Sequence, residues 1–177
     1  MRLDTICVQG AYKPKSGEPR VIPIVQSTTF KYDSSEAMGD LFDLKVSGYF
    51  YSRLQNPTCD YAAAKIALLE GGVAGMLTSS GQAANFYAVL NIAQAGDHIV
   101  SSSAIYGGTF NLFNVTLRKL GIDFTFVSPH ATAEEIQAAI KPNTKCIFGE
   151  TISNPSLDVL DIELFAEKEG LTAHANS

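Results

Sequence analysis

Extended apolar runs and helical segments alternate along most of this chain, and that alternation constrains the fold more than any other feature. Connections of about ten to fifteen helical residues between short strands are typical of βαβ units. The pattern therefore predicts an α/β fold with three layers, in which helices cover both faces of a mostly parallel sheet. The expected strands are residues 73–78, 98–102, 122–127 and 145–150, and the expected helices are residues 59–70, 82–95, 109–120 and 132–140, with a further helix beginning at Asp161.

Capping signals support two of these helices. Gly71 and Gly72 follow the alanine- and leucine-rich segment 59–70, as expected of a helix C-cap. Thr132 and Glu135 have the spacing of a capping box, which predicts that a helix begins between them.

The first 57 residues look different, with Pro14, Pro19, Pro23 and Pro57 and little sustained periodicity. They predict an irregular arm with one short helix near residues 34–44, beginning at Ser34 or Ser35. We therefore divide the chain into an N-terminal arm, residues 1–57, and part of a larger α/β domain, residues 58–177.

Composition excludes several classes of function. The net charge of −5 and the lack of a Lys/Arg-rich run argue against nucleic-acid binding. No apolar run approaches the ~20 residues that a membrane span requires. The three cysteines are far apart and odd in number, which favours free thiols in a reducing cytoplasm over disulfides, and no His, Cys, Asp or Glu spacing predicts a metal site. No signal peptide is visible, so we expect a cytoplasmic protein.

In a parallel sheet, ligands bind beyond the carboxyl ends of the strands, so the turn after each expected strand is a candidate site. The turn Ser79–Gln82 joins an expected strand to a helix, and its small residues leave the first helical N–H groups open to an anion. Ser80, Gly81 and Gln82 are therefore candidate phosphate ligands. The turn lacks both the P-loop and the Gly-x-Gly-x-x-Gly patterns, and by itself it is also compatible with an ordinary tight turn.

Three further segments carry candidate residues. Tyr106 follows the expected strand 98–102 and precedes two glycines, so its ring could stack on a planar ligand and its phenol could serve as an acid or base. Asn154, held before a proline, could donate a hydrogen bond to a ligand oxygen. In the arm, Tyr51 and Arg53 could bind a phosphate. Each alone has a structural alternative: a loop aromatic, an Asn-Pro turn, or a surface arm that packs on a partner.

Taken together and in this order, these segments resemble the pyridoxal-phosphate-dependent enzymes of cysteine and methionine metabolism, from Thr5 to about Phe165. The resemblance implies an incomplete fold-type I large domain that binds pyridoxal 5'-phosphate. The segments that carry it are Pro23–Phe30, Tyr51-Ser52-Arg53, Asn56-Pro57-Thr58, Leu69–Gly72, Ser79–Ala84, Tyr106–Thr109 and Glu150–Pro155.

The resemblance also implies a role for each candidate. The Ser80-Gly81-Gln82 turn would hold the cofactor phosphate, with the N–H groups of Gly81 and Gln82 as donors. Tyr106 would stack on the pyridine ring and act as an acid or base near the leaving group, and Asn154 would hydrogen-bond the ring's 3-oxygen. Tyr51 and Arg53 would reach the phosphate of a neighbouring subunit, which implies a homo-oligomer, commonly a tetramer made of two dimers.

Within the family, the segments Thr5–Gly10, Tyr51–Arg53 and Tyr106–Phe113 are similar to the sulfhydrylase branch. That branch implies γ-replacement on the amino-acid substrate O-acetyl-L-homoserine, in which sulfide or methanethiol displaces acetate to give homocysteine or methionine. The alternatives are cystathionine γ-synthase and the methionine or cystathionine γ-lyases. Methionine γ-lyases usually carry a cysteine at the position of Gly108.

The family's Schiff-base lysine is expected in a Ser-x-Thr-Lys segment beyond residue 177. Thr144-Lys145 has a superficially similar pattern, but it lies at the amino end of an expected strand, away from the ligand edge. We therefore expect these 177 residues to be the N-terminal part of the enzyme, inactive alone and active once a complementary C-terminal chain completes them. The alternatives from other classes are a non-catalytic fragment that acts only as an assembly partner, and a phosphate binder without cofactor chemistry.

Overall fold

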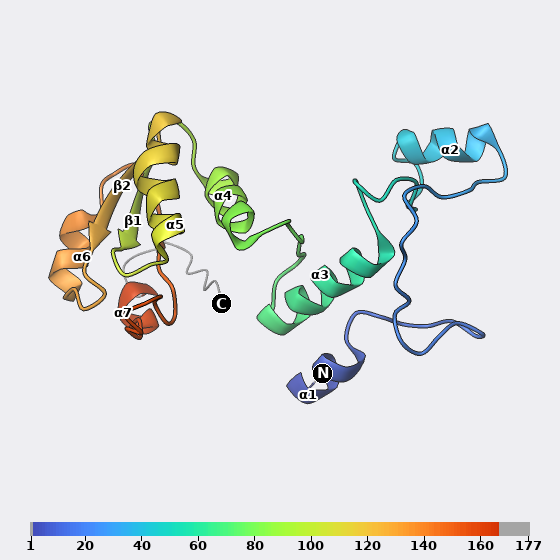
Figure 1. Ribbon diagram of the computed structural model, residues 1–177, viewed down its shortest axis with the longest axis horizontal. Helices are drawn as coiled ribbons and strands as arrows, with labels where there is room; N and C mark the ends of the chain where they lie inside the picture. Colours follow the sequence, from blue (N-terminus) through green and yellow to red (C-terminus); the bar gives the residue numbers. More distant parts are fainter. Residues whose placement is uncertain (1, 167–177) are drawn as a thin grey trace. The chain divides into compact units, whose positions relative to one another are not determined.

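The computed structural model describes residues 2–166 and divides the chain into two compact units, residues 1–78 and 79–177 (Figure 1). The unit boundary places helix 57–70 in the first unit, whereas the sequence grouped that helix with the α/β domain.

The first unit consists of three helices joined by irregular segments: α1 (Leu3–Gln9), α2 (Ser35–Phe42) and α3 (Pro57–Glu70). Ser34 caps α2 by accepting a hydrogen bond from the Ala37 N–H at 3.1 Å, which confirms the short helix expected near residues 34–44. The short helix α1 was not expected, because none of its residues is buried and it leaves no apolar periodicity in the sequence.

Helix α3 begins and ends as its sequence requires. Asn56 accepts a hydrogen bond from the Thr58 N–H at 3.0 Å, and Pro57 occupies the first helical position, where no N–H is needed. Gly71 closes the helix in the left-handed conformation, with φ of 68°, which confirms the expected C-cap.

Hydrogen bonds fix the irregular arm to the start of α3. The Asn56 side chain donates to the Val25 carbonyl at 3.0 Å, and the Thr58 hydroxyl accepts from the Val25 N–H at 2.9 Å. The same hydroxyl donates to the Pro23 carbonyl at 2.9 Å. The Asn56-Pro57-Thr58 segment therefore has a structural role, because its side chains join the arm at Pro23 and Val25 to the start of α3.

The second unit contains a parallel sheet of β1 (His98–Ser102), β2 (Asp123–Val127) and β3 (Thr144–Phe148), in the order β2-β1-β3. All five residues of the central strand β1 are buried. Its helices are α4 (Gly81–Ile92), α5 (Gly107–Asn111), which continues into the π-helical segment η1 (Leu112–Leu117), α6 (Ala133–Ala139) and α7 (Ile162–Ala166).

Helices cover both faces of this sheet, and Figure 1 shows α5 and α6 on opposite sides of the strands. Alternate residues of a strand point to opposite faces, and the two apolar clusters follow that rule. One cluster lies under α4, α5 and η1 and contains Val89, Ile99, Phe113, Leu117, Phe124 and Phe148. The other lies under α6 and α7 and contains Ala131, Ile136, Phe165, Val127 and Ile147. The expected three-layer α/β architecture is confirmed.

Most predicted elements of this unit are also confirmed, including the capping box of Thr132 and Glu135 at the start of α6. One prediction was wrong in detail in each unit, the first of them in residues 73–78 of the first unit. Residues 73–78 do not form a strand: none of the described strands pairs with them, and Val73 and Met76 are exposed, so the backbone finds no sheet partner. The helix expected at residues 109–120 begins at Gly107 and contains a π-helical turn that the sequence did not indicate.

Candidate active site

The turn before α4 has the geometry of an anion cradle. Ser80 is the N-cap, and its hydroxyl accepts a hydrogen bond from the Ala83 N–H at 3.1 Å. Gly81 and Gln82 occupy the first two helical positions, whose N–H groups have no acceptor within a helix. A methyl group added at Gly81 would meet nothing within 4 Å, so the space around its Cα is open to a ligand.

Tyr106 lies beyond the carboxyl end of β1, where it forms the N-cap of α5. Its side chain is 50% exposed. Its backbone N–H donates a hydrogen bond of 2.9 Å to Oε1 of Glu150, which lies just after β3. Because β1 and β3 are parallel neighbours, this bond joins two loops at the same edge of the sheet.

Gly108 brings the cradle and the tyrosine together. A Cβ built on Gly108 would lie within 2.5 Å of both Tyr106 Cε1 and Gln82 Nε2, so both side chains rest against the bare glycine backbone. A hydrogen bond of 3.1 Å from Asn85 Nδ2 to Thr109 Oγ1 joins α4 to α5 beside this contact. The structure thus places two of the predicted segments, residues 80–82 and Tyr106, at one site.

Asn154 lies at the same edge of the sheet, in a tight turn after β3. The turn is closed by a bridge between Ile152 and Val159 and by a hydrogen bond of 2.9 Å from the Ser153 N–H to the Asp158 carbonyl. The Asn154 side chain is exposed. The hydrogen bond between this loop and the Tyr106 segment is made by Glu150 and not by Asn154.

Tyr51 and Arg53 lie in the first unit, where they form a cation–π pair with the guanidinium carbon 4.9 Å from the ring centroid. Arg53 is exposed. The backbone of Tyr51 is held by a bridge to Thr29. The pair is therefore held on the arm as one cationic and aromatic group.

Other candidate groups are accounted for by the fold. His98 is fully buried, and its two ring nitrogens lie 2.7 and 2.8 Å from the hydroxyls of Thr144 and Thr125. Burial lowers the pKa of His98, so the ring is a neutral structural group. Lys145 lies 3.6 Å from Asp97 at the amino ends of the strands, which confirms the prediction that it lies away from the ligand edge.

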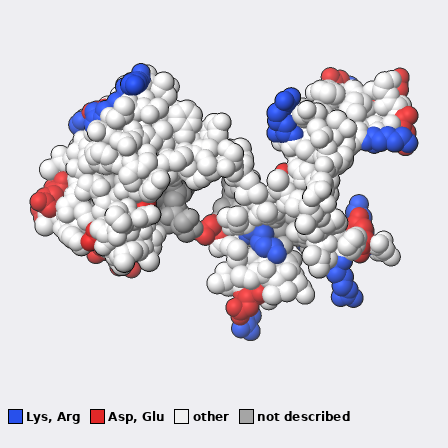
Figure 2. All heavy atoms as spheres, in the orientation of Figure 1, with Lys and Arg blue, Asp and Glu red and all other residues white. Residues whose placement is uncertain are grey.

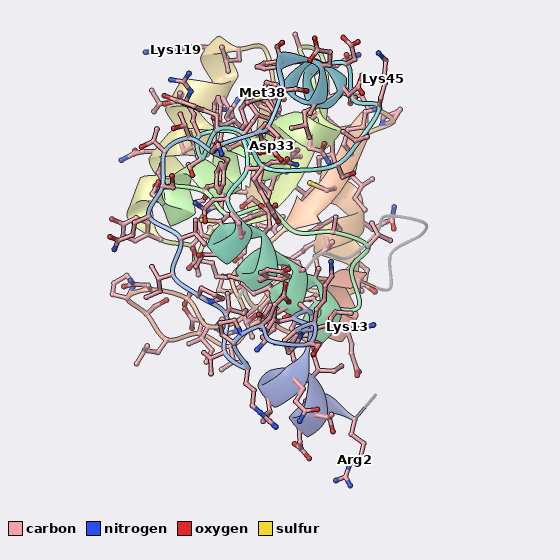
Figure 3. All side chains as sticks on the ribbon, turned by 90° about the vertical axis from the view of Figure 1, so that its right-hand side faces the viewer. Arg2, Lys13, Asp33, Met38, Lys45 and Lys119 are labelled. Atoms are coloured by element: carbon pink, nitrogen blue, oxygen red, sulfur yellow. The ribbon has the colours of Figure 1, made fainter. Side chains whose placement is uncertain are left out.

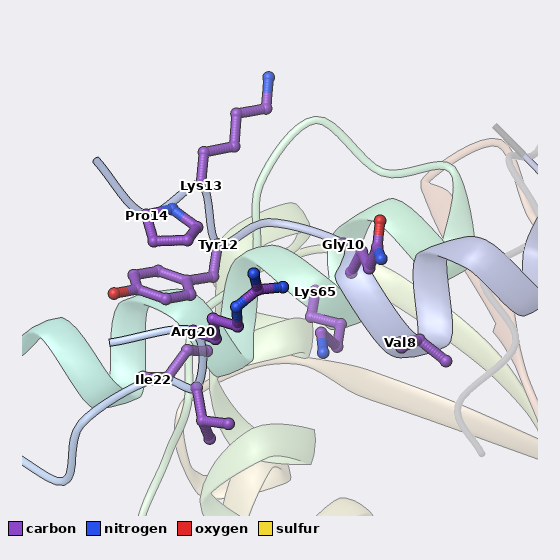
Figure 4. Close-up of a pocket in the computed structure, with 10 residues that line it drawn as sticks. Val8, Gly10, Tyr12, Lys13, Pro14, Arg20, Ile22 and Lys65 are labelled. Carbon is purple, nitrogen blue, oxygen red and sulfur yellow. The ribbon is translucent and has the colours of Figure 1, made fainter. Parts of the chain in front are cut away.

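A separate cavity of about 670 Å³ lies within the first unit and contains none of the predicted cofactor residues. Lys13 and Arg20 are both among its lining residues, and Figure 4 shows the end of the Lys13 side chain directed away from the other labelled side chains. Lys65 also lines it, but its amine donates to the Cys7 carbonyl at 3.2 Å.

Charged side chains elsewhere are distributed in small groups. Figure 2 shows basic and acidic residues interspersed on the face that it presents, and Figure 3 shows Arg2, Lys45 and Lys119 directed away from the ribbon. Lys45 pairs with Asp40 at 3.2 Å and Asp43 at 2.9 Å. In residues 2–166, no helix combines the length and apolar character of a membrane span, and no cluster of three potential metal ligands is present.

Sequence reasoning gave no contact to Glu150 or Gly108. Glu150 was seen only as part of a motif, where its signal was an acidic side chain two residues after the end of a strand, and Gly108 was used only to separate branches of the family. The crowding at Gly108 involves a residue 26 positions earlier in the chain, and no local pattern reveals such a contact.

Comparisons with known proteins place this site in a family. The chain is 52% identical over 158 residues to an O-acetyl-L-homoserine sulfhydrylase from Corynebacterium glutamicum, covering 89% of this chain and 35% of that protein. It is 41% identical over 155 residues to an L-methionine gamma-lyase from Fusobacterium nucleatum, covering 88% of this chain and 38% of that protein.

A crystal structure described as that of an O-acetylhomoserine (thiol)-lyase from Campylobacter jejuni, which carries a pyridoxyl-lysine phosphate group, is also similar. The two share 36% identity with a TM-score of 0.81, over 95% of this chain and 42% of that one. The chain thus spans between 35% and 42% of the length of these relatives. The family model described as Cys/Met metabolism PLP-dependent enzyme matches residues 4–172. The chain therefore belongs to the family of pyridoxal-phosphate-dependent enzymes of cysteine and methionine metabolism.

Proposed function

We propose that this chain forms the part of a pyridoxal-phosphate-dependent transferase that binds the cofactor phosphate and covers the cofactor ring. The observation that carries the proposal is the contact at Gly108, which holds the ring of Tyr106 beside Gln82 of the anion cradle. A ligand with an anionic tail and a flat aromatic body matches this arrangement.

The residues present fit the cofactor. The N–H groups of Gly81 and Gln82 would bind its phosphate at the positive end of α4, beside the Ser80 cap, in the open space above Gly81. Tyr106 would lie against the pyridine ring, and Asn154 would donate to the ring's 3-oxygen. When bound, the cofactor supplies the capacity to hold an electron pair released from the substrate.

Tyr106 would also handle a proton. Tyr106 is half exposed and its backbone is fixed by Glu150, so its side chain is accessible to a bound amino acid while the backbone keeps its position. We propose that Tyr106 Oη carries a proton to or from the leaving group of that substrate.

The proposed reaction is γ-replacement on O-acetyl-L-homoserine, with sulfide or methanethiol as the sulfur donor and homocysteine or methionine as the product. The Corynebacterium relative carries the name of this activity at 52% identity, against 41% for the γ-lyase relative. Gly108 supports the same choice, since the cysteine that methionine γ-lyases usually carry there would displace the Gln82 and Tyr106 side chains from their places beside the glycine.

We further propose that the active protein is a cytoplasmic homo-oligomer, a dimer or a dimer of dimers. In it, Tyr51 and Arg53 would bind the phosphate held by a neighbouring subunit, for which the preformed cation–π pair provides a guanidinium and a hydroxyl. The Schiff-base lysine and the groups that bind the substrate carboxylate would come from the C-terminal part of the complete enzyme.

The test is an activity assay on a protein in which this chain is joined to the C-terminal part of a relative from the same family. Incubated with pyridoxal phosphate, O-acetyl-L-homoserine and sulfide, it should form homocysteine and release acetate. Methionine alone should yield little 2-oxo acid. Rapid 2-oxo acid release from methionine with slow homocysteine formation would contradict the sulfhydrylase proposal, and the 177 residues alone serve as the control expected to be inactive.

A further inference from the structure

Two consecutive glycines at the start of α5 have opposite surroundings. A Cβ added at Gly107 would meet nothing within 4 Å. A Cβ added at Gly108 would lie 2.3 Å from Gln82 Nε2 and 2.5 and 3.1 Å from two ring carbons of Tyr106. Real Cβ atoms do not approach other heavy atoms this closely, so position 108 accepts no side chain unless Gln82 and Tyr106 move.

Backbone conformation does not explain the glycine. Gly108 is helical and is not among the residues with positive φ, so an alanine could adopt its backbone angles without strain. Glycine inside a helix is less stable than alanine by roughly 0.5–1 kcal/mol. A side chain at position 108 would therefore act by displacing the two neighbouring side chains and not by straining the backbone.

The Gln82 carboxamide is held by this packing. Its Oε1 is buried and has no hydrogen-bond donor among the described residues, while its Nε2 lies against Gly108. Among the described residues no hydrogen bond to this oxygen fixes the side chain, so the Gln82 carboxamide is held by the packing of its volume.

We propose that the Gln82 side chain and Gly108 together position Tyr106. The carboxamide fills the space that a Cβ at residue 108 would take, and the Tyr106 ring rests on the remaining bare backbone beside it. This role belongs to the Gln82 side chain and is separate from that of its backbone N–H, and it makes Gln82 a positioning residue. The inference deepens the proposed function, because Tyr106 is the residue proposed to cover the ring and move the proton.

The paired glycines supply a test with a built-in control. In the 177-residue chain, Gly107→Ala should raise the thermal midpoint slightly, since it improves a helix and meets no atoms. Gly108→Ala should lower the midpoint by at least about 4 °C, the shift that a small domain shows for a modest destabilisation. It should also move the ring resonances of Tyr106, identified by their loss in Tyr106→Phe.

Two variants of Gln82 keep the test decisive if Gly108→Ala does not fold. Gln82→Ala opens space and should shift the Tyr106 ring resonances, whereas Gln82→Met, similar in volume, should leave them in place. Combining Gln82→Ala with Gly108→Ala should recover part of the lost midpoint, because the ring can move into the vacated space. Equal midpoints for the two glycine variants, or Tyr106 resonances that ignore Gln82→Ala, would overturn the proposal.

In the completed enzyme with its cofactor, Gly108→Ala should lower kcat at least tenfold while KM changes less, because a small displacement of a reacting group costs rate. The resonance measurements need neither cofactor nor turnover. Failure of the assigned reaction would therefore leave the positioning result intact, and failure of the positioning result would leave the reaction intact.

Discussion

Replacing Phe113 tests whether the apolar cluster under α4, α5 and η1 is packed as the structure shows. Phe113 is fully buried under the sheet-facing side of η1. Its ring stacks on Phe124 with centroids 4.8 Å apart and meets the edge of Phe148 at 4.8 Å. Phe113→Ala removes a whole buried side chain from this cluster and should cost about 3–5 kcal/mol of unfolding free energy.

Phe113→Leu separates the two contributions. It keeps most of the apolar burial but loses both ring pairs, each worth about 0.5–1.5 kcal/mol, so the cost should be about 1–3 kcal/mol. Val115→Ala is the matched control: Val115 lies on the same segment and is 46% exposed, so its replacement should change stability by less than about 0.5 kcal/mol.

The assay is amide hydrogen exchange of the buried strand β1, read together with urea unfolding. The slowest amides of a core strand report the opening of the unit that contains it, which avoids assuming that both units unfold together. A cost below about 1 kcal/mol for Phe113→Ala, or a cost equal to that of Val115→Ala, would show that the cluster is not packed around this ring.

Three further predictions concern single residues. Glu150→Ala should move the Tyr106 amide proton resonance upfield and lower activity of the completed enzyme, with partial rescue in Glu150→Gln, and an unchanged Tyr106 resonance would contradict the bond between them. Burial lowers the pKa of His98, so the unfolded state binds a proton more readily than the folded state. Stability should therefore fall as pH drops below the ordinary histidine pKa of about 6.5. His98→Gln should flatten this pH dependence in thermal melts, and an equally steep curve would contradict the role of His98. Burial raises the pKa of the Cys146 thiol to about 11, so iodoacetamide at pH 8 should alkylate the exposed Cys7 well before Cys146, and the reverse order by mass spectrometry would be contrary to the structure.

Elements with local signals were predictable from sequence. Strand β1 has the predicted bounds, and the predicted cap residues Ser34, Gly71 and Thr132 lie where helix chemistry needs them. Helix α1 was not predicted because it buries no residue, and the π-helical turn of η1 was not predicted because no local pattern in residues 112–117 marks it. Residues 73–78 have the composition of a strand, but a strand forms only beside a partner, and composition cannot supply one.

The candidate site was predictable as a location rather than as a set of contacts. The rule that ligands bind beyond the carboxyl ends of parallel strands led to Ser80–Gln82, Tyr106 and Asn154. All of them lie in the second unit: Gly81 and Gln82 begin α4, Tyr106 is the N-cap of α5, and Asn154 lies in the turn after β3, although the residues before Ser80 do not form the expected strand. The contacts that organise the site, Gln82 with Gly108 and Tyr106 with Glu150, join residues 26 and 44 positions apart. Both contacts depend on how distant segments of the chain pack together, which no local sequence pattern reveals.

The central claim is that the cradle before α4 and the ring of Tyr106 bind the two ends of one cofactor. Titration of the ¹⁵N-labelled chain with pyridoxine 5'-phosphate, which lacks the aldehyde and so does not react with lysines, tests it most directly. The account predicts that the amide resonances of Gly81 and Gln82 move together with the ring resonances of Tyr106, and that pyridoxine without its phosphate leaves them unchanged at the same concentration. Shifts confined to Arg20 and Lys65, at the cavity of the first unit, would contradict it.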